Sequence, residues 1–261
     1  MKLEGKVSLV TDASRGIGKA IALKLTNLGS KVAVNYHEGE VEANRLVWEI
    51  TSRGGEAISI KADVADSEAV KDMVRKVTDK WGQEVDILVN NAGIYPYTPF
   101  AEMPDAIRDR VIDINIKGVW NCTKAVIPGM IKQRYGKIIN ISSVTGPMVS
   151  ARGDLIYSAS KGAVSGFTRG LALEVAEYGI NVNAICPGYI DTPGMRRMAS
   201  EMGMDPDEYL GKLSKSIPLG RLGSIEEIGD LAAFLASEES KYITGAEIVI
   251  DGGNIIQEEK S

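Results

Sequence analysis

The chain has 261 residues, 44% hydrophobic and 25% charged, which is the composition of a globular protein that folds without metals or disulfides. Its formal net charge of −5 gives no basic field to attract a phosphodiester backbone, so we expect no nucleic-acid partner. No run of 18 or more apolar residues occurs, and the opening MKLEGKVSLV lacks the hydrophobic region of a signal peptide. We therefore expect a cytoplasmic protein with no membrane partner.

Residues used in metal and triad chemistry are scarce. His37 is the single histidine and hence the one candidate base for a Ser-His-Asp hydrolase, and the Cys/His/Glu clusters of zinc enzymes are missing. Cys122 and Cys186 have no CxxC neighbour, so we expect two buried free thiols. We expect no metal site.

Seven short β-branched runs alternate with amphipathic segments along the chain. The runs are KVSLV (6–10), KVAVNY (31–36), EAISI (56–60), VDILVN (85–90), GKIINI (136–141), INVNAI (180–185) and EIVI (247–250). Strict alternation of strands and helices is typical of right-handed βαβ units. We predict one α/β domain over 1–261, a Rossmann-like, doubly wound, seven-stranded parallel sheet with helices on both faces.

Helix ends are marked at several positions. Asp66 is a predicted N-cap for a helix that runs to Trp81-Gly82, and Gly29 is a predicted stop for a helix with one apolar face, formed by Ile17, Ile21, Leu25 and Leu28. The alternation of strand and helix patterns is interrupted over 189–216, where glycines and prolines recur. We interpret this segment as a long substrate loop, functional or mobile.

The first strand runs directly into Thr11-Asp12-Ala13-Ser14-Arg15-Gly16-Ile17-Gly18 and then into a helix. A strand, a tight turn and a helix N-terminus form a binding site for a pyrophosphate, through free backbone N–H groups and the helix dipole. A glycine pair in a turn fits an ordinary βα connection equally well, so the rest of the chain must decide.

Further motifs follow in a fixed order. They are Asp63-Val64, Asn90-Asn91-Ala92-Gly93, Asn115 in DINIKG, Tyr157-Ser158-Ala159-Ser160-Lys161, Pro187-Gly188 with Thr192, and the terminal ITGAEIVIDGG. With TDASRGIG, they resemble the TGxxxGxG, NNAG and YxxxK pattern of the short-chain dehydrogenase/reductase family, from Lys6 to about Asn254. The resemblance implies an NAD(P)-dependent oxidoreductase of the class EC 1.1.1.-.

The resemblance implies a dinucleotide site. Its residues are Asp12, Ser14, Arg15, Gly16, Ile17, Gly18, Tyr36, His37, Asp63, Val64, Asn91, Ala92, Gly93, Tyr157, Lys161, Pro187, Gly188, Ile190 and Thr192. At the end of the second strand Tyr36 stands where an acidic residue would exclude a 2′-phosphate, and the Arg15 guanidinium can pair with phosphate. NADP(H) is therefore favoured over NAD(H), although Glu38 lies close by.

Asp12 departs from the family pattern, which has glycine at this position. A Cβ and a negative charge near the phosphates should weaken cofactor binding, whereas the turn itself should form. The alternative function is therefore a dinucleotide-binding or regulatory protein with weak turnover. An epimerase or dehydratase related to the extended members of the family is a third alternative.

Reduction of a carbonyl needs a proton on oxygen as well as a hydride on carbon. Tyr157 and Lys161 are one helical turn apart, so the ammonium should lower the pKa of the phenol that donates the proton. The resemblance implies that Ser143, rather than its neighbour Ser142, bonds the substrate oxygen, and that Asn115 holds a helix kink and a water. Between Ser143 and Tyr157 there are 13 residues, one more than usual, which should reshape the pocket at 147–156.

The substrate is expected to be a small hydrophobic or aromatic carbonyl compound or alcohol. The expected pocket walls are apolar or aromatic: Tyr95, Pro96, Tyr97, Val144 to Val149, Met195, Met198 and Met202, although the methionines could simply be packing. The resemblance extends to 3-oxoacyl-acyl-carrier-protein reductases and to carbonyl, sugar-alcohol and hydroxysteroid reductases. A carrier protein would need a basic patch, with Arg134, Arg152, Arg196 and Arg197 as candidates. The family also implies a homotetramer that uses the helices around Asn115 and Tyr157 and the C-terminal segment.

Overall fold

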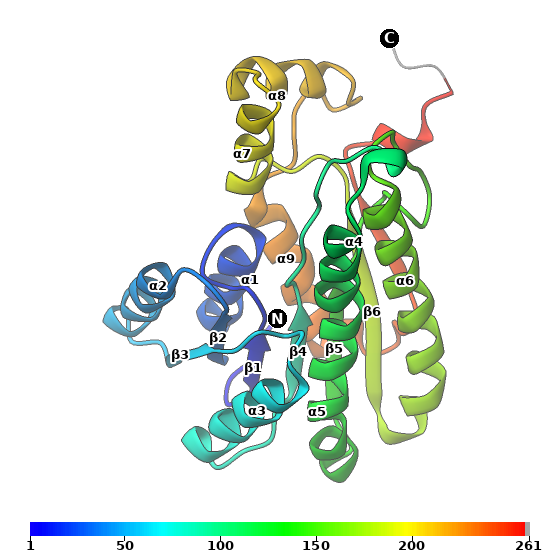
Figure 1. The fold of residues 1–261 in the computed structure, drawn as a ribbon. Coiled ribbons are helices and arrows are strands. Elements are labelled where there is room, and N and C mark those ends of the chain that lie inside the picture. The colour runs from blue at the N-terminus through cyan, green and yellow to red at the C-terminus, as the bar shows by residue number, and fades with distance from the viewer. Residues whose placement is uncertain (259–261) are drawn as a thin grey trace.

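In a computed structural model, which describes residues 1–258, seven strands form one parallel sheet in the order β3-β2-β1-β4-β5-β6-β7 (Figure 1). The strands are β1 (Val7–Val10), β2 (Lys31–Tyr36), β3 (Ala57–Lys61), β4 (Ile87–Asn90), β5 (Gly136–Ile141), β6 (Ile180–Pro187) and β7 (Glu247–Ile250). All seven predicted strands are confirmed, with shifts of one or two residues at some ends. The central strands β1, β4 and β5 are buried throughout, as a sheet covered on both faces requires.

Two hydrophobic cores lie on opposite faces of the sheet. One core packs α1 (Gly16–Asn27), α2 (Glu40–Ser52) and α9 (Ile225–Ala236) against the strands. The other packs α3 (Ser67–Trp81), α5 (Gly118–Gln133) and α6 (Leu155–Val175). The doubly wound arrangement is therefore confirmed. Within residues 1–258 no helix is long and apolar enough to cross a membrane.

The chain enters α5 through a distorted helical segment. α4 (Asp105–Val111) continues into a π-helical turn at Ile112–Lys117, which contains Asn115, and then into α5. Short 3₁₀ turns occur at Phe100–Glu102, Ala176–Tyr178, Glu238–Ser240 and Asn254–Ile256.

The segment 189–216 is not a plain loop, because most of it folds into α7 (Pro193–Glu201) and α8 (Pro206–Lys215), which form a lobe beside the sheet (Figure 1). Thr192 caps α7 by accepting from Met195 N at 3.1 Å, and Asp205 caps α8 by accepting from Glu208 N at 2.9 Å. Both prolines are at the first helical position, where the missing N–H costs nothing. The prolines that suggested an interruption therefore begin helices.

The predicted helix ends and thiols agree with the structure. The Asp66 carboxylate accepts hydrogen bonds from Glu68 N at 2.9 Å and Ala69 N at 3.1 Å, which fixes the start of α3. Gly29, with φ of +96°, ends the turn after α1. Cys122 and Cys186 are free and buried.

Removal of the Asp66 cap should destabilise the fold locally. We expect Asp66→Ala to lower the free energy of unfolding by about 1 kcal/mol in a urea titration, because two N–H groups lose their acceptor. Asp66→Asn keeps an acceptor oxygen and should lose much less. Equal losses in the two variants would contradict the capping role.

Candidate active site

The turn between β1 and α1 adopts a backbone conformation that favours glycine. Asp12 has φ of +46°, in the left-handed region that costs a side-chain-bearing residue roughly 1 to 2 kcal/mol. Two asparagines hold the turn in place: Asp12 N donates to Asn35 Oδ1 at 3.2 Å, and Asn91 Nδ2 donates to Asp12 O at 3.0 Å. The position expected to be glycine is thus strained but well tethered.

The start of α1 lies against this turn without room for a side chain at Gly18. A Cβ on Gly18 would lie 2.5 Å from Asp12 O and 2.6 Å from Asn91 Nδ2. Thr11 links the same turn to the end of β4, since its Oγ1 accepts from Asn91 N and Ala92 N, both at 2.9 Å. The TDASRGIG and NNAG segments are therefore one packed unit.

The first turn of α1 offers unpaired polar groups to a ligand. Its N-cap residue, Arg15, is exposed and makes no side-chain capping bond, so the helix N-terminus keeps free N–H groups. The Ser14 hydroxyl is buried without a hydrogen-bond partner among the described residues and faces Gly39, whose Cβ position would be 3.3 Å away. An orphaned hydroxyl beside an uncapped helix start fits a phosphate-bearing dinucleotide.

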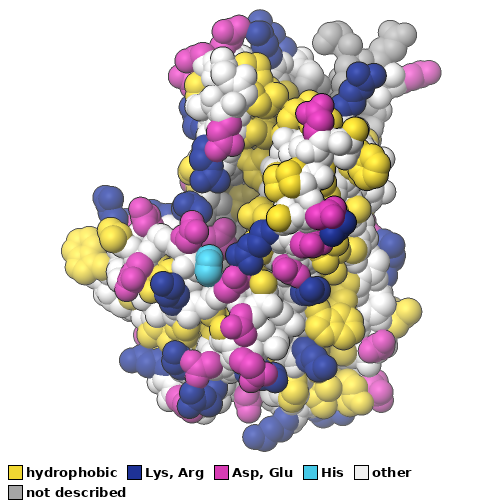
Figure 2. All heavy atoms as spheres, viewed as in Figure 1, with side chains coloured by type: hydrophobic (Ala, Val, Ile, Leu, Met, Phe, Trp, Pro, Cys, Tyr) yellow, Lys and Arg dark blue, Asp and Glu magenta, His cyan; other side chains and the backbone are white. Residues whose placement is uncertain are grey.

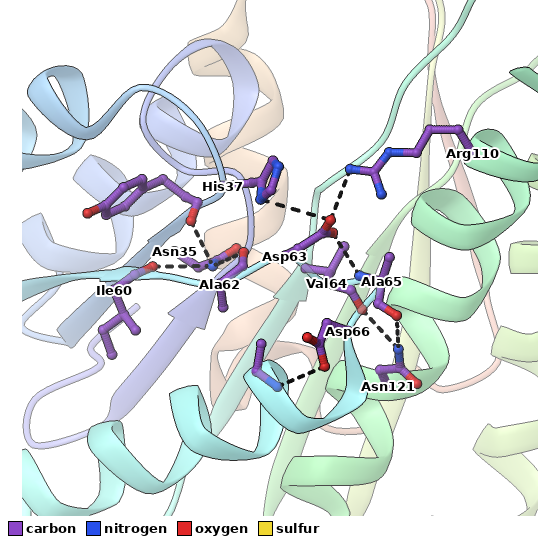
Figure 3. A network of polar contacts seen from close by, with 12 residues as sticks. Asn35, His37, Ile60, Ala62, Asp63, Val64, Ala65, Asp66, Arg110 and Asn121 are labelled. Atoms are coloured by element: carbon purple, nitrogen blue, oxygen red, sulfur yellow. Dashed lines mark hydrogen bonds and ion pairs between the residues drawn. The ribbon is translucent and has the colours of Figure 1, made fainter. Parts of the chain in front are cut away.

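Asp63 is the centre of the polar network in Figure 3. Its carboxylate accepts from Ala65 N at 2.9 Å and Arg110 Nη2 at 3.0 Å, and His37 Nδ1 lies 3.9 Å away. Burial opposes ionisation, but the bonds from Ala65 and Arg110 outweigh it and lower the pKa of Asp63. Arg110, on α4, belongs to no motif, so the sequence did not reveal it.

The side chain of Tyr36 is buried in the core rather than exposed beside this network. Burial raises the pKa of the Tyr36 phenol, and the negative charge of Glu40 raises it further. His37, which is 51% exposed and lies next to Asp63, is the side chain open to a ligand at the end of β2.

Tyr157 and Lys161 lie one turn apart on α6, with Nζ 5.6 Å from the centre of the phenol ring. Lys161 Nζ donates to Ile141 O at 2.7 Å, at the end of β5. Burial raises the pKa of Tyr157 to about 12 and lowers the pKa of Lys161 to about 8. The expected lowering of the Tyr157 pKa by Lys161 is not seen, because burial dominates and the ammonium is turned toward the carbonyl.

Ser143 is the serine that reaches Tyr157. Its hydroxyl lowers the pKa of the Tyr157 phenol and so partly offsets the effect of burial, and it accepts a hydrogen bond from Thr145 N at 3.0 Å. Ser142 is engaged elsewhere: its Oγ donates to Lys161 O at 3.2 Å and lies 3.3 Å from Ser165 Oγ. Gly146 packs the Ser143 loop onto α6, since a Cβ there would lie 2.3 Å from Ser158 O.

Asn115 connects α5 and α6 to the NNAG loop. It is 1% exposed, and its amide exchanges two hydrogen bonds with the Ile94 backbone, both at 2.9 Å. Its Nδ2 also donates to Ser160 Oγ at 3.0 Å. A Cβ at Gly93 would lie 3.5 Å from both Asn115 Oδ1 and Lys161 Nζ, so the three segments converge at one point.

Tyr95 lies next to Tyr157. The ring of Tyr95 packs edge-on against it, with centroids 5.9 Å apart, and Gly194 of α7 lies beside the Tyr95 hydroxyl. In Figure 2 the surface is hollowed below the α7–α8 lobe, and hydrophobic side chains line the hollow. Met195 and Met198 are part-buried, whereas Met202 is 41% exposed.

The remaining predicted residues lie at the end of β6 or on distant surfaces. Gly188 packs so closely on Asp251 that a Cβ would lie 2.6 Å from Asp251 Cβ, and Ile190 is buried. The four arginines form no common patch: Arg134 precedes β5 at the opposite edge of the sheet, Arg196 pairs with Asp191 and Asp207, Arg197 lies 3.8 Å from Glu201, and Arg152 is exposed.

Comparison with known proteins agrees with this geometry. The family described as enoyl-(acyl carrier protein) reductase matches residues 12–254. The oxidoreductase UcpA of Salmonella typhimurium is 46% identical over all of this chain and 98% of its own length. The 3-oxoacyl-[acyl-carrier-protein] reductase FabG of Staphylococcus epidermidis is 42% identical over 95% of this chain and 98% of its own.

Solved structures show the same relationship. A short-chain dehydrogenase/reductase from Serratia marcescens has a TM-score of 0.88 at 35% identity and covers 97% of this chain and 99% of its own. One from Mycobacterium marinum has a TM-score of 0.89 at 35% identity, with 98% of each chain covered. The chain belongs to the short-chain dehydrogenase/reductase family and is an NAD(P)-dependent oxidoreductase.

The contact at Gly146 can be tested against a second glycine of the same site. Gly146→Ala should lower the free energy of unfolding by about 1 to 3 kcal/mol, because the added methyl meets Ser158 O and must push the Ser143 loop away from α6. Gly162→Ala, where no atom lies within 4 Å of the new Cβ, should instead stabilise α6 by roughly 0.5 to 1 kcal/mol. Equal effects in urea denaturation would contradict the close packing.

Proposed function

We propose that the chain catalyses hydride transfer between NADP(H) and a carbonyl or secondary alcohol substrate, with Tyr157 as general acid and base. The observation that carries the proposal is the convergence of Asn115, Ser143, Tyr157 and Lys161 from three separate segments at the carboxyl edge of the sheet. The nicotinamide ring, when bound, supplies the hydride that adds to the carbonyl carbon.

Side chains of the protein would supply the proton to the substrate oxygen. The substrate oxygen would sit between the Ser143 hydroxyl and the Tyr157 phenol, whose pKa Ser143 lowers. With a pKa of about 12 the phenol is protonated at neutral pH, which is the state that donates to the developing alkoxide. Lys161, whose pKa of about 8 lies near neutrality, can exchange a proton. Asn115 and the Ile94 carbonyl would hold the water that resupplies it.

The preference for NADP(H) is supported by the groups at the end of β2 and the start of α1. No carboxylate takes the place of Tyr36, His37 is exposed, and Arg15 is an exposed cation. Within residues 1–258 the Ser14 hydroxyl has no hydrogen-bond partner. A guanidinium and donor groups together suit a 2′-phosphate.

Exposed apolar residues on α5 and α6 support the proposal that the chain forms an oligomer. Trp120 on α5 packs at a tilt against Phe167 of α6, with ring centres 5.8 Å apart, and stays 56% exposed; Leu173 is 85% exposed. An apolar face of this kind on the helices around Asn115 and Tyr157 favours a homotetramer built on α5 and α6.

The regulatory alternative rests on Asp12 alone. Burial raises the pKa of its carboxyl, although the Arg15 charge opposes this, so an anion is held at some cost beside the phosphate site. The intact chain of Asn115, Ser143, Tyr157 and Lys161 favours the enzyme, because a binding protein needs no proton donor.

Tyr157→Phe tests the proposed proton donor. We expect kcat/KM for a panel of ketones with NADPH to fall roughly 10²- to 10⁴-fold, because the oxygen no longer receives a positioned proton. The dissociation constant for NADPH should change little, since the ring remains packed against Tyr95. Full turnover by the variant would contradict the assignment.

Asp12→Gly separates the enzyme from the regulatory alternative. We expect the unaltered protein to bind NADPH by calorimetry and to reduce ketones, and the variant to bind roughly tenfold more tightly, about 1.4 kcal/mol, because a negative charge beside the phosphate site is removed. NADPH binding and turnover confined to the variant would favour the regulatory protein.

A further inference from the structure

Tyr95 lies between the proposed proton donor and the α7–α8 lobe. Its ring packs against the ring of Tyr157 at an interplanar angle of 62°, with centroids 5.9 Å apart. At the far end of the same side chain, the hydroxyl lies 3.1 Å from the position that a Cβ on Gly194 would take, at the start of α7. Gly194 therefore leaves the room that the Tyr95 hydroxyl needs, and a residue with a Cβ there would press on the phenol.

The chain is fixed on both sides of Tyr95. Before it, Ile94 N donates to Asn115 Oδ1, and Ile94 O accepts from Asn115 Nδ2, both at 2.9 Å. After it, Thr98 N donates to Gly153 O at 3.0 Å, in the segment that leads into α6. The point from which the Tyr95 side chain projects is therefore set by hydrogen bonds to the same parts of the chain that form the proposed catalytic site.

Part of the Tyr95 side chain remains uncovered. Tyr95 is 39% exposed, and Tyr97 two residues later is 49% exposed. A carbonyl compound whose oxygen bonds the Tyr157 phenol has its carbon substituents within reach of any ring that packs on Tyr157, and Tyr95 is such a ring. The exposed surface of Tyr95 is therefore available to a substituent of the substrate.

An aromatic surface in this place favours a flat substituent. Aromatic rings attract one another edge to face or offset, with centroids about 4.5 to 7 Å apart, and Tyr95 already forms such a pair with Tyr157. An aryl group beside the carbonyl would add a third ring to this pair. A saturated ring is thicker, and the contact with Gly194 leaves the Tyr95 phenol little room to move back toward α7.

We propose that Tyr95 is a specificity-determining residue, which favours ketones with an aryl group on the carbonyl carbon over ketones with a saturated ring there. The inference rests on the proposed function, because Tyr157 sets the position of the carbonyl. Gly194 acts through Tyr95, since its lack of a side chain fixes how far the phenol lies from α7 and hence how much space is left beside the substrate.

Acetophenone and cyclohexyl methyl ketone test the preference, because each carries a six-membered ring, flat in the first and puckered in the second. With NADPH we expect the unaltered protein to favour acetophenone in kcat/KM. Tyr95→Leu keeps an apolar side chain but removes the ring, so the ratio of acetophenone to the cyclohexyl ketone should fall roughly fivefold. Tyr95→Phe keeps the ring and should keep the ratio within about twofold. The different intrinsic reactivities of the two ketones cancel when ratios are compared between variants.

A double-mutant cycle tests the contact with α7. Gly194→Ala places a methyl group 3.1 Å from the Tyr95 hydroxyl, so the phenol must move toward the substrate, and the ratio should rise roughly threefold. In the Tyr95→Phe background the nearest ring atom is Cε1, at 3.7 Å, so Gly194→Ala should leave the ratio unchanged. Gly211→Ala, on α8, where no atom lies within 4 Å of the new Cβ, is the matched control and should also leave it unchanged.

The outcomes separate specificity from activity. A preference for the cyclohexyl ketone in the unaltered protein, a ratio that Tyr95→Leu leaves unchanged, or an equal effect of Gly194→Ala in both backgrounds overturns the inference while ketone reduction stands. If neither ketone is reduced, the proposed function fails, and ligand-observed NMR titrations of the two ketones into the protein with NADPH give their dissociation constants instead. Tighter binding of acetophenone that Tyr95→Leu abolishes supports the inference, and binding that is absent or unaltered by the substitution overturns it.

Discussion

The parallel register of β1, β4, β5 and β6 is the constraint on which the rest of the site depends. Because all four strands point the same way, their carboxyl ends meet at one edge, and the segments that follow them converge there. The contacts at Gly18 and Gly146 then fix how closely these segments approach α1 and α6. The sheet therefore brings these segments together at one edge, and the two glycines allow them to pack closely.

Burial at this edge of the sheet sets the pKa values of Tyr157 and Lys161. The same desolvation raises the pKa of Tyr157 and brings the pKa of Lys161 close to neutrality, so one environment sets the protonation of the proposed donor and of its proposed proton source. The free-energy cost of this burial is offset by the packing of the sheet, by the bond that Ile141 O accepts from Lys161 Nζ, and by the bond that Asn115 donates to Ser160 Oγ. In the turn between β1 and α1, Asp12 has a strained backbone conformation, which hydrogen bonds with Asn35 and Asn91 hold in place.

Much of the fold could be predicted because its determinants are local. Alternating β-branched runs indicated all seven strands, and Asp66 and Gly29 gave correct helix ends. The two helices within 189–216 were not predicted. Pro193 and Pro206 suggested a loop, whereas each follows a capping residue, Thr192 or Asp205, and begins a helix. Arg110 belongs to no motif, and only the folded chain brings it to Asp63. The burial of Tyr36 and the raised pKa of Tyr157 likewise depend on tertiary packing.

The central claim is that this site moves a hydride from a reduced nicotinamide to a carbonyl carbon. The most direct measurement is turnover of a ketone with NADPH deuterated at C4 on each face in turn, with mass and NMR analysis of the alcohol. The account predicts one deuterium on the carbinol carbon from one face of the ring and none from the other. An alcohol without deuterium from either face, or no alcohol at all, would contradict it.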